Sequence, residues 1–304
     1  MTRGACRPPL RPLRRAWLSI LLLLPLTGSA PASATSSAPM VFVPAGEFLM
    51  GSPEGTEGFS DERPQRLVLV SAFWIDRSEV TNDQYDRFVK ASGHRAPANP
   101  NQSATLWEHG TYLPGSADHP VVNVSWHDAA AYCAWAGKRL PTEAEWEKAA
   151  RGTNARIYPW GNDWDLARAN SASYWAGRTV EFKDRAEWKA FWVEGEGARL
   201  SKERGLKGEV LTLPVGSFPG GASPYGLFDM AGNVSEWVND WYEPYYYLNA
   251  PPADPAGPAG VLLKVVRGGS WLKPAKSLRT SDRDYGYPDD RQSGTGFRCA
   301  KDDR

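Results

Sequence analysis

Glycine, proline and tryptophan interrupt this sequence so often that no regular element in it can run far. The 304 residues include 29 Gly, 25 Pro and 14 Trp. Gly and Pro end helices and strands, and this composition excludes collagen-like, coiled-coil and multi-pass membrane proteins. Disordered chains are poor in aromatic residues, so they are excluded as well. We therefore predict a loop-rich globular fold with one large core or two small ones.

Residues 1–34 predict a signal peptide. They contain five Arg and no acidic residue, and their apolar core at 16–26 is too short to span a bilayer. Ala32-Ser33-Ala34 offers a cleavage site before a short linker at 35–39. Pro25 argues against the alternative, a buried N-terminal helix. We expect an exported protein, periplasmic or extracellular, with no transmembrane anchor after cleavage; the export route, Sec or twin-arginine, stays open.

The charge balance changes once this segment is removed. Five of the 35 basic residues lie in it, which leaves 30 basic residues against 35 acidic ones. A nucleic-acid partner requires a clustered basic surface, so we expect none.

Only two cysteines, Cys133 and Cys299, follow the signal segment, because Cys6 lies within it. In an oxidising compartment two remaining cysteines indicate one disulfide. Two separately buried thiols are the alternative, and a redox or metal pair is a third interpretation for which the long separation offers no motif.

Three helix starts share one signature, a hydroxyl residue followed three positions later by a side-chain acceptor. Helices of this kind are expected to end at Gly93, Gly137 and Gly152. In the second helix Cys133 shares a face with small apolar residues, so its sulfur should point inward. The pairs that form the signature are Thr81 and Gln84, Ser125 and Asp128, and Thr142 and Glu145.

The remaining elements are short. Segment 40–51 alternates around a Pro-Ala-Gly turn and predicts a β-hairpin, while 66–70 and 73–75 predict further strands. Residues 178–209 form a highly charged inserted segment, in which aromatic residues recur at helical spacing. We interpret it as a helix packed on the body, with a partner-binding surface as the alternative. These aromatic residues are Phe182, Trp188, Phe191 and Trp192.

Several motifs together resemble the formylglycine-generating enzyme (sulfatase-modifying factor) family. The resemblance extends over 40–303 and implies a single α+β domain at 40–304, with that family's irregular C-type-lectin-like fold and little regular secondary structure. It also implies that the cysteines matching Cys133 and Cys299 form a structural disulfide. The motifs lie at 120–129, 132–147, 158–162, 225–237, 266–271 and 296–300.

The enzymes that name the family oxidise a sulfatase cysteine to formylglycine, using oxygen and copper(I) held by two thiolates. Soft copper(I) selects sulfur ligands, and the family places both thiols shortly after the Gly-Gly-Ser motif at 268–270. Residues 270–279 contain no Cys, and Lys273 stands in the place of the first thiol. A Trp of the family's active-site wall is replaced by Ser235. Copper bound through thiolates is therefore not expected.

A second branch of the family makes sulfoxides with iron bound by three histidines, largely from an N-terminal helical domain. This chain contains four His residues and lacks paired metal-ligand spacing. Iron of this kind is not expected. The histidines are His94, His109, His119 and His127.

The resemblance also implies calcium. Asp229 and Glu236 offer hard carboxylate oxygens, and the carbonyls of Gly232 and Val234 lie between them in the sequence, matching a family calcium site. Two solvated acids beside a packed Trp are the alternative interpretation. Asn170 matches one ligand of a second family calcium site, whose other ligands fall where the insert disturbs the alignment.

The candidate catalytic residues are Ser270 and Lys273, which the resemblance places at the cleft. Lys273 is predicted to be either a base or a contact for an anion. The arginines that flank the same region, Arg279 and Arg283, are expected to form structural ion pairs. The other flanking residues are Asp282, Asp284 and Tyr285.

Two functional hypotheses follow. In the first, the protein tailors or matures a peptide or protein partner by chemistry without thiolates, as in the cysteine-free family members of siderophore-chromophore maturation. In the second, it is a non-catalytic binding or assembly protein that retains the lectin-like groove. Fold alone does not choose between them, so whether the protein is an enzyme stays open.

Overall fold

The computed structural model describes residues 1–2, 38–98 and 105–303. The chain divides into two units, 1–36 and 37–304, and the second carries the α+β fold described below. The predicted signal peptide lies almost entirely outside the described residues. Within the described part of the chain, no helix is long and apolar enough to cross a membrane.

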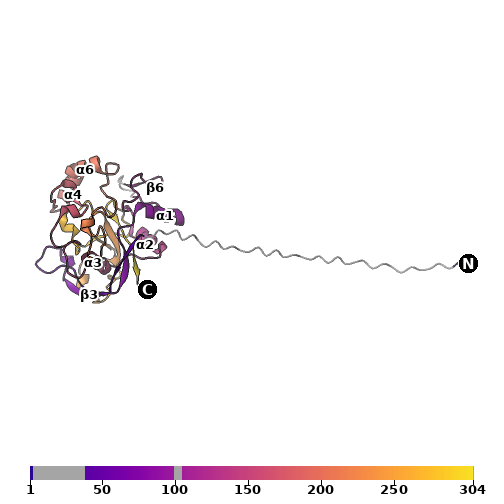
Figure 1. The fold of residues 1–304 in the computed structure, drawn as a ribbon, viewed down its shortest axis with the longest axis horizontal. Coiled ribbons are helices and arrows are strands. Elements are labelled where there is room, and N and C mark those ends of the chain that lie inside the picture. Colours follow the sequence, from indigo (N-terminus) through magenta and orange to yellow (C-terminus); the bar gives the residue numbers. More distant parts are fainter. Residues whose placement is uncertain (3–37, 99–104, 304) are drawn as a thin grey trace. The chain divides into compact units, whose positions relative to one another are not determined.

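Three helices begin where the capping boxes predict. They are α1 (Asn82–Ser92), α2 (Trp126–Trp135) and α3 (Glu143–Arg151), and each N-cap hydroxyl accepts a bond from the backbone three residues later. Figure 1 shows α1 and α2 close together and α3 near β3. The other helical segments are η1 (Ser60–Glu62), η2 (Leu166–Arg168), α4 (Ala172–Ala176), α5 (Arg185–Lys189), η3 (Ala190–Glu194), α6 (Glu196–Arg204), η4 (Pro219–Gly221), α7 (Tyr246–Asn249) and η5 (Ala275–Leu278).

The strands among the described residues form four small sheets. One holds three strands in the order β1 (Met40–Val43), β4 (Phe73–Asp76), β11 (Ala300–Asp302). The largest has the order β10 (Thr295–Gly296), β7 (Ser235–Trp241), β8 (Lys264–Arg267), β9 (Asp284–Gly286), and its β10–β7 pair is parallel. The two-stranded sheets pair β2 (Gly46–Met50) with β3 (Arg66–Val70), and β5 (Trp107–Glu108) with β6 (Thr111–Tyr112).

The predicted hairpin at 40–51 is wrong. Both strands exist, but β1 pairs with β4 and β2 pairs with β3, so the two enter different sheets. The buried Lys148 ammonium donates to the carbonyls of Pro44 and Gly46, at 2.7 and 2.9 Å. The turn is thus bound to helix α3, and this contact between distant segments cannot be read from local alternation.

The disulfide is confirmed, since Cys133 and Cys299 are bonded with their Cα atoms 5.6 Å apart. Cys133 lies on the inner face of α2, and Cys299 immediately precedes β11. Both sulfurs sit in the larger apolar core, near the packed rings of Tyr85, Tyr132 and Phe297. The bond therefore joins the second helix to the end of the fold.

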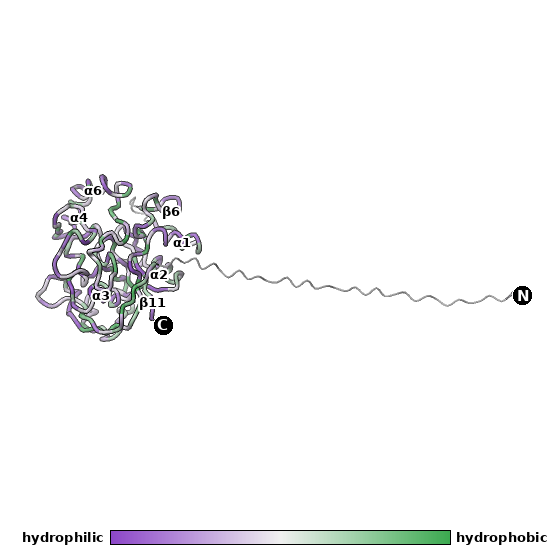
Figure 2. Tube along the Cα trace, in the orientation of Figure 1, coloured by the Kyte–Doolittle hydropathy of each residue, from purple (hydrophilic) through white to green (hydrophobic). Residues whose placement is uncertain are grey.

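The inserted segment packs on the body of the fold. It contains α5, η3 and α6, and Figure 1 shows α6 beside α4, in agreement with their contacts. Phe182, Trp192 and Leu200 are buried in the larger core. The outer helix α6 is largely hydrophilic (Figure 2). The amphipathic spacing of the aromatic residues thus corresponds to packing of the insert on the core.

Candidate functional site

A cleft of about 780 Å³ contains both candidate catalytic residues. It lies between strands β7, β8 and β9, the segment 270–277, and the insert. Ser270 and Lys273 line it together with Ser235, the residue expected in place of a tryptophan. The remaining lining residues include Trp237, Val266, Leu272, Asp284, Tyr285 and Gln292.

Lys273 is held as a cation in this cleft. Its ammonium donates to Asp284 at 2.9 Å, and the two side chains are 36% and 43% exposed. Burial opposes the charge, but the Asp284 carboxylate more than offsets it and raises the Lys273 pKa. A general base needs a neutral amine, which the raised pKa of Lys273 disfavours, and the charge of Lys273 is already paired with Asp284.

Ser270 is buried, and its Oγ accepts a long bond of 3.4 Å from the Leu272 amide. Activation of a serine requires a base within hydrogen-bond reach. The residues that line the cleft include neither His nor Cys. The hydrogen bond described for Ser270 Oγ is to a backbone amide and not to a base, so this contact does not activate it as a nucleophile.

Arg267 fixes the segment beneath the cleft. Its guanidinium is fully buried in β8 and donates to the carbonyls of Thr280, Ser281 and Asp282 at 2.6 to 3.1 Å. The same group is paired with Glu147 of helix α3. Four acceptors from two distant segments thus converge on one cation, so the loop that leads into β9 cannot move independently of α3.

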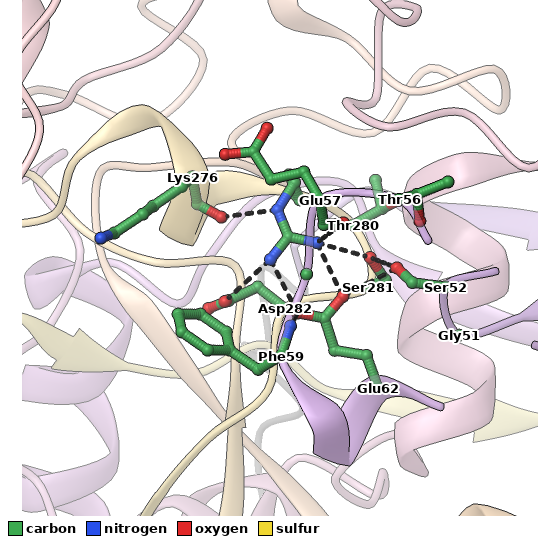
Figure 3. Close-up of polar contacts among 12 residues, drawn as sticks. Gly51, Ser52, Thr56, Glu57, Phe59, Glu62, Lys276, Thr280, Ser281 and Asp282 are labelled. Atoms are coloured by element: carbon green, nitrogen blue, oxygen red, sulfur yellow. Dashed lines mark hydrogen bonds and ion pairs between the residues drawn. The ribbon is translucent and has the colours of Figure 1, made fainter. Parts of the chain in front are cut away.

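Two further arginines form the predicted structural ion pairs. Arg279 binds both oxygens of the buried Glu62 at 2.7 Å, and Figure 3 shows Glu62 and Ser281 around that guanidinium group. Burial raises the pKa of Glu62, but Arg279 outweighs it and holds that pKa below its usual value. Arg283 binds both oxygens of Glu143 at 2.7 and 3.0 Å. The expectation of structural ion pairs is confirmed.

Asp282 lies beside the first pair: its Oδ1 is 3.5 Å from the Arg279 guanidinium (Figure 3), too far for a hydrogen bond, and it forms none with any other described residue. Burial, with Glu62 nearby, raises its pKa to about 8. An unfolded chain ionises this group near pH 4, so the wild-type protein loses stability as the pH rises from about 4 to about 8.

Asp282→Asn removes this loss. We expect its free energy of unfolding to match that of the wild type near pH 4 and to exceed it by about 1 kcal/mol or more at pH 8.5. Urea denaturation at both pH values measures the difference. Asp289→Asn, at a side chain that is 87% exposed, is the control and should follow the wild type. A difference that shrinks toward high pH would contradict the assignment.

The predicted calcium residues lie around a buried charge cluster. Glu236 is fully buried, and both its oxygens bind Arg298 at 2.7 Å. Asp229 has a positive φ of 58° and accepts the Gly216 amide at 2.6 Å. Burial raises the pKa of Asp229. Arg298 thus neutralises the charge of Glu236. Among the described residues, Asp229 forms no ion pair with an arginine.

Sequence reasoning missed Glu79, which belongs to the same cluster. Its side chain is fully buried, and neither carboxyl oxygen has a hydrogen-bond partner. Burial, and then the nearby Asp229, raise the pKa of Glu79 well above its ordinary value. Such a group needs a proton or a cation. Residues 76–79 are all polar or charged, so the local pattern gave no signal that Glu79 would be buried.

Asn170 is the candidate ligand of the second calcium site, and both polar atoms of its side chain already form hydrogen bonds. Its Oδ1 accepts the Trp175 indole at 2.6 Å, and its amide donates to Leu211 and Asn233. A calcium ion at this oxygen would compete with the indole, so the second calcium site stays a prediction.

The four histidines lie apart. His94 contacts Asp128, His119 contacts Thr212, and the exposed His127 lies 4.0 Å from Asp289. Across the described ranges, no three His, Cys, Asp or Glu side chains are grouped so as to hold a metal ion. Copper held by thiolates does not fit these residues either, because Cys133 and Cys299 are bonded to each other.

Comparison with known families decides the assignment. The sulfatase-modifying factor enzyme 1-like domain matches residues 27–303, most of the chain. The chain belongs to this family. The formylglycine-generating enzyme of Thermomonospora curvata is 39% identical, over 86% of this chain and 93% of that protein. The inactive C-alpha-formylglycine-generating enzyme 2 of Mus musculus is 33% identical, over 86% and 85%.

Two solved structures agree with the fold. PvdO from Pseudomonas aeruginosa is 28% identical, with a TM-score of 0.66, over 87% of this chain and 94% of that one. CarF, at 22% identity and a TM-score of 0.54, shows the shared fold alone. The predicted α+β fold and the predicted family are both confirmed.

Proposed function

We propose that this family member is exported and binds a segment of a peptide or protein partner in the cleft, where it tailors or matures that partner without thiolate-held copper. The observation that carries this proposal is the Lys273–Asp284 ion pair, which stands where the family's first thiol is expected. Family relatives named for formylglycine generation support a proteinaceous partner.

The first claim to test is that the protein does not use thiolate-held copper. The mature protein is incubated with a Cys-containing sulfatase peptide, copper(I) and oxygen, and any aldehyde is trapped with a hydrazide. We expect no aldehyde, while the Thermomonospora curvata enzyme provides the positive control. Copper-dependent aldehyde formation by this protein would refute the proposal.

A non-catalytic binding or assembly role is the second candidate. It is favoured by Ser270, which has neither His nor Cys beside it in the cleft, and by similarity to a relative named inactive. Peptides that bind the cleft separate the two roles. An unchanged peptide mass after incubation under oxygen would favour the binding role, and a mass change that Lys273→Met abolishes would favour maturation.

Export is part of the same proposal. If the signal segment is removed after Ala34, the N-terminus of the protein recovered outside the cytoplasm should begin near Thr35. Protein recovered with residues 1–34 intact in the cytoplasm would contradict export.

We also propose that calcium binds at Asp229. The buried Glu79 carboxyl group beside Asp229 supports this, because two adjacent buried acids need a shared proton or a cation, and calcium prefers several hard oxygens. The other ligands would be the Asp229 carboxylate and the carbonyls of Gly232 and Val234. Glu236 would contribute only if it shared its oxygens with Arg298.

Chelation should therefore destabilise the protein. Loss of a ligand present at about 100 times its dissociation constant costs about 2.7 kcal/mol, which lowers the melting temperature by about 5 °C or more in a domain of this size. Differential scanning calorimetry with calcium and with EGTA measures the shift. Glu79→Gln and Asp229→Ala should abolish it, whereas Glu47→Gln on an exposed strand position should retain it. Equal melting temperatures with and without calcium would refute the site.

A further inference from the structure

The insert is fastened to the cleft segment that carries Lys273. The indoles of Trp188 and Trp192 both donate to the Leu272 carbonyl, at 3.2 and 2.9 Å. Trp192 also packs edge-on against Trp271, with ring centres 5.1 Å apart. These contacts place the insert as a fixed wall of the cleft.

Four insert residues line the cleft, two aromatic and two charged. Phe182 and Trp188 present apolar surface, and Asp184 and Arg185 stand at the start of α5. The partner that enters the cleft must therefore touch the insert as well as the family scaffold. An extended segment with both apolar and charged side chains fits such a lining.

The charges of the lining favour an acidic partner. Three basic residues, Lys273, Lys276 and Arg185, face two acidic ones, Asp184 and Asp284. This balance is the reverse of that of the chain after residue 34, which carries 30 basic and 35 acidic residues. The cleft is thus more basic than the protein around it.

Most of these charges already have a local partner. Lys273 is bound to Asp284, and Asp184 accepts the first amides of α5 at 2.8 and 3.0 Å. Lys276 donates to the Phe182 carbonyl at 2.6 Å and lies near Glu181, whose pKa burial raises. Arg185 is exposed and forms no ion pair with any residue that the structure describes. Its guanidinium is the group left for a ligand.

We infer that the insert selects a peptide segment that carries an acidic side chain, with Arg185 as the carboxylate contact and Trp188 as the neighbouring apolar surface. An arginine fork binds a carboxylate through two parallel bonds, and such a contact adds specificity as well as affinity. This inference rests on the proposed cleft function and adds the class of partner to it.

The test uses the mature wild-type protein and a displayed library of random heptapeptides. We expect the wild type to enrich peptides that contain Asp or Glu. Arg185→Gln should still enrich peptides but lose the acidic preference, and it should bind the wild-type peptides about tenfold more weakly. Lys183→Gln is the matched control, because this neighbouring cation is 88% exposed and does not line the cleft.

Variants with a blocked cleft distinguish a failure of this inference from a failure of the proposed function. Ser277→Trp and Gln292→Trp place an indole at two different lining positions and should abolish enrichment while the melting temperature is retained. Peptides that bind the wild type without any acidic preference would overturn the inference alone. Peptides that bind the blocked variants and the wild type equally, or no enrichment at all, would overturn cleft binding itself.

Discussion

Replacing both Cys133 and Cys299 with alanine should lower the free energy of unfolding by roughly 5 kcal/mol. The disulfide closes a loop with a sequence separation of 166 residues, and its loss frees that loop in the unfolded chain. In a domain of this size the melting temperature should fall by about 10 °C, which calorimetry measures.

The control for this prediction is chemical reduction. Dithiothreitol should lower the melting temperature of the wild type toward that of the double variant and leave the variant unchanged. A wild type that melts at the same temperature with and without dithiothreitol, after its thiols are shown to be reduced, would contradict the prediction.

Arg267→Met should cost about 3 to 5 kcal/mol of stability, the range for removing one partner of a buried ion pair. Glu147 would lose one of its two arginines, and three backbone carbonyls would lose their donor. The methionine fills much of the same volume, so the loss reports on charge and hydrogen bonds more than on a cavity. Urea unfolding at neutral pH gives the difference.

Arg168→Met is the matched control for this change. Arg168 pairs with Asp165 at the surface, with side chains 42% and 45% exposed, and such pairs contribute about 1 kcal/mol or less. Similar losses for Arg267→Met and Arg168→Met would show that the buried network does not stabilise the fold.

Much of the candidate site was predictable from single positions. The absence of Cys from 270–279 and the presence of Lys273 are visible in the residues themselves, and the motifs around them carry the family. The role of Lys273 was not predictable, because it depends on Asp284, which the β8–β9 pairing brings beside it. Glu79 was missed for the same reason, since its burial beside Asp229 joins segments 150 residues apart in number.

The sequence by itself predicted three helix starts and favoured the bond between the two cysteines that follow residue 34. Capping boxes at Thr81, Ser125 and Thr142 act within one helical turn, so each start was predictable from four residues. Tertiary structure alone decided that β1 and β2 join different sheets and that the insert forms a wall of the cleft. Those outcomes depend on free energies of burial and charge pairing between distant segments, which no local pattern encodes.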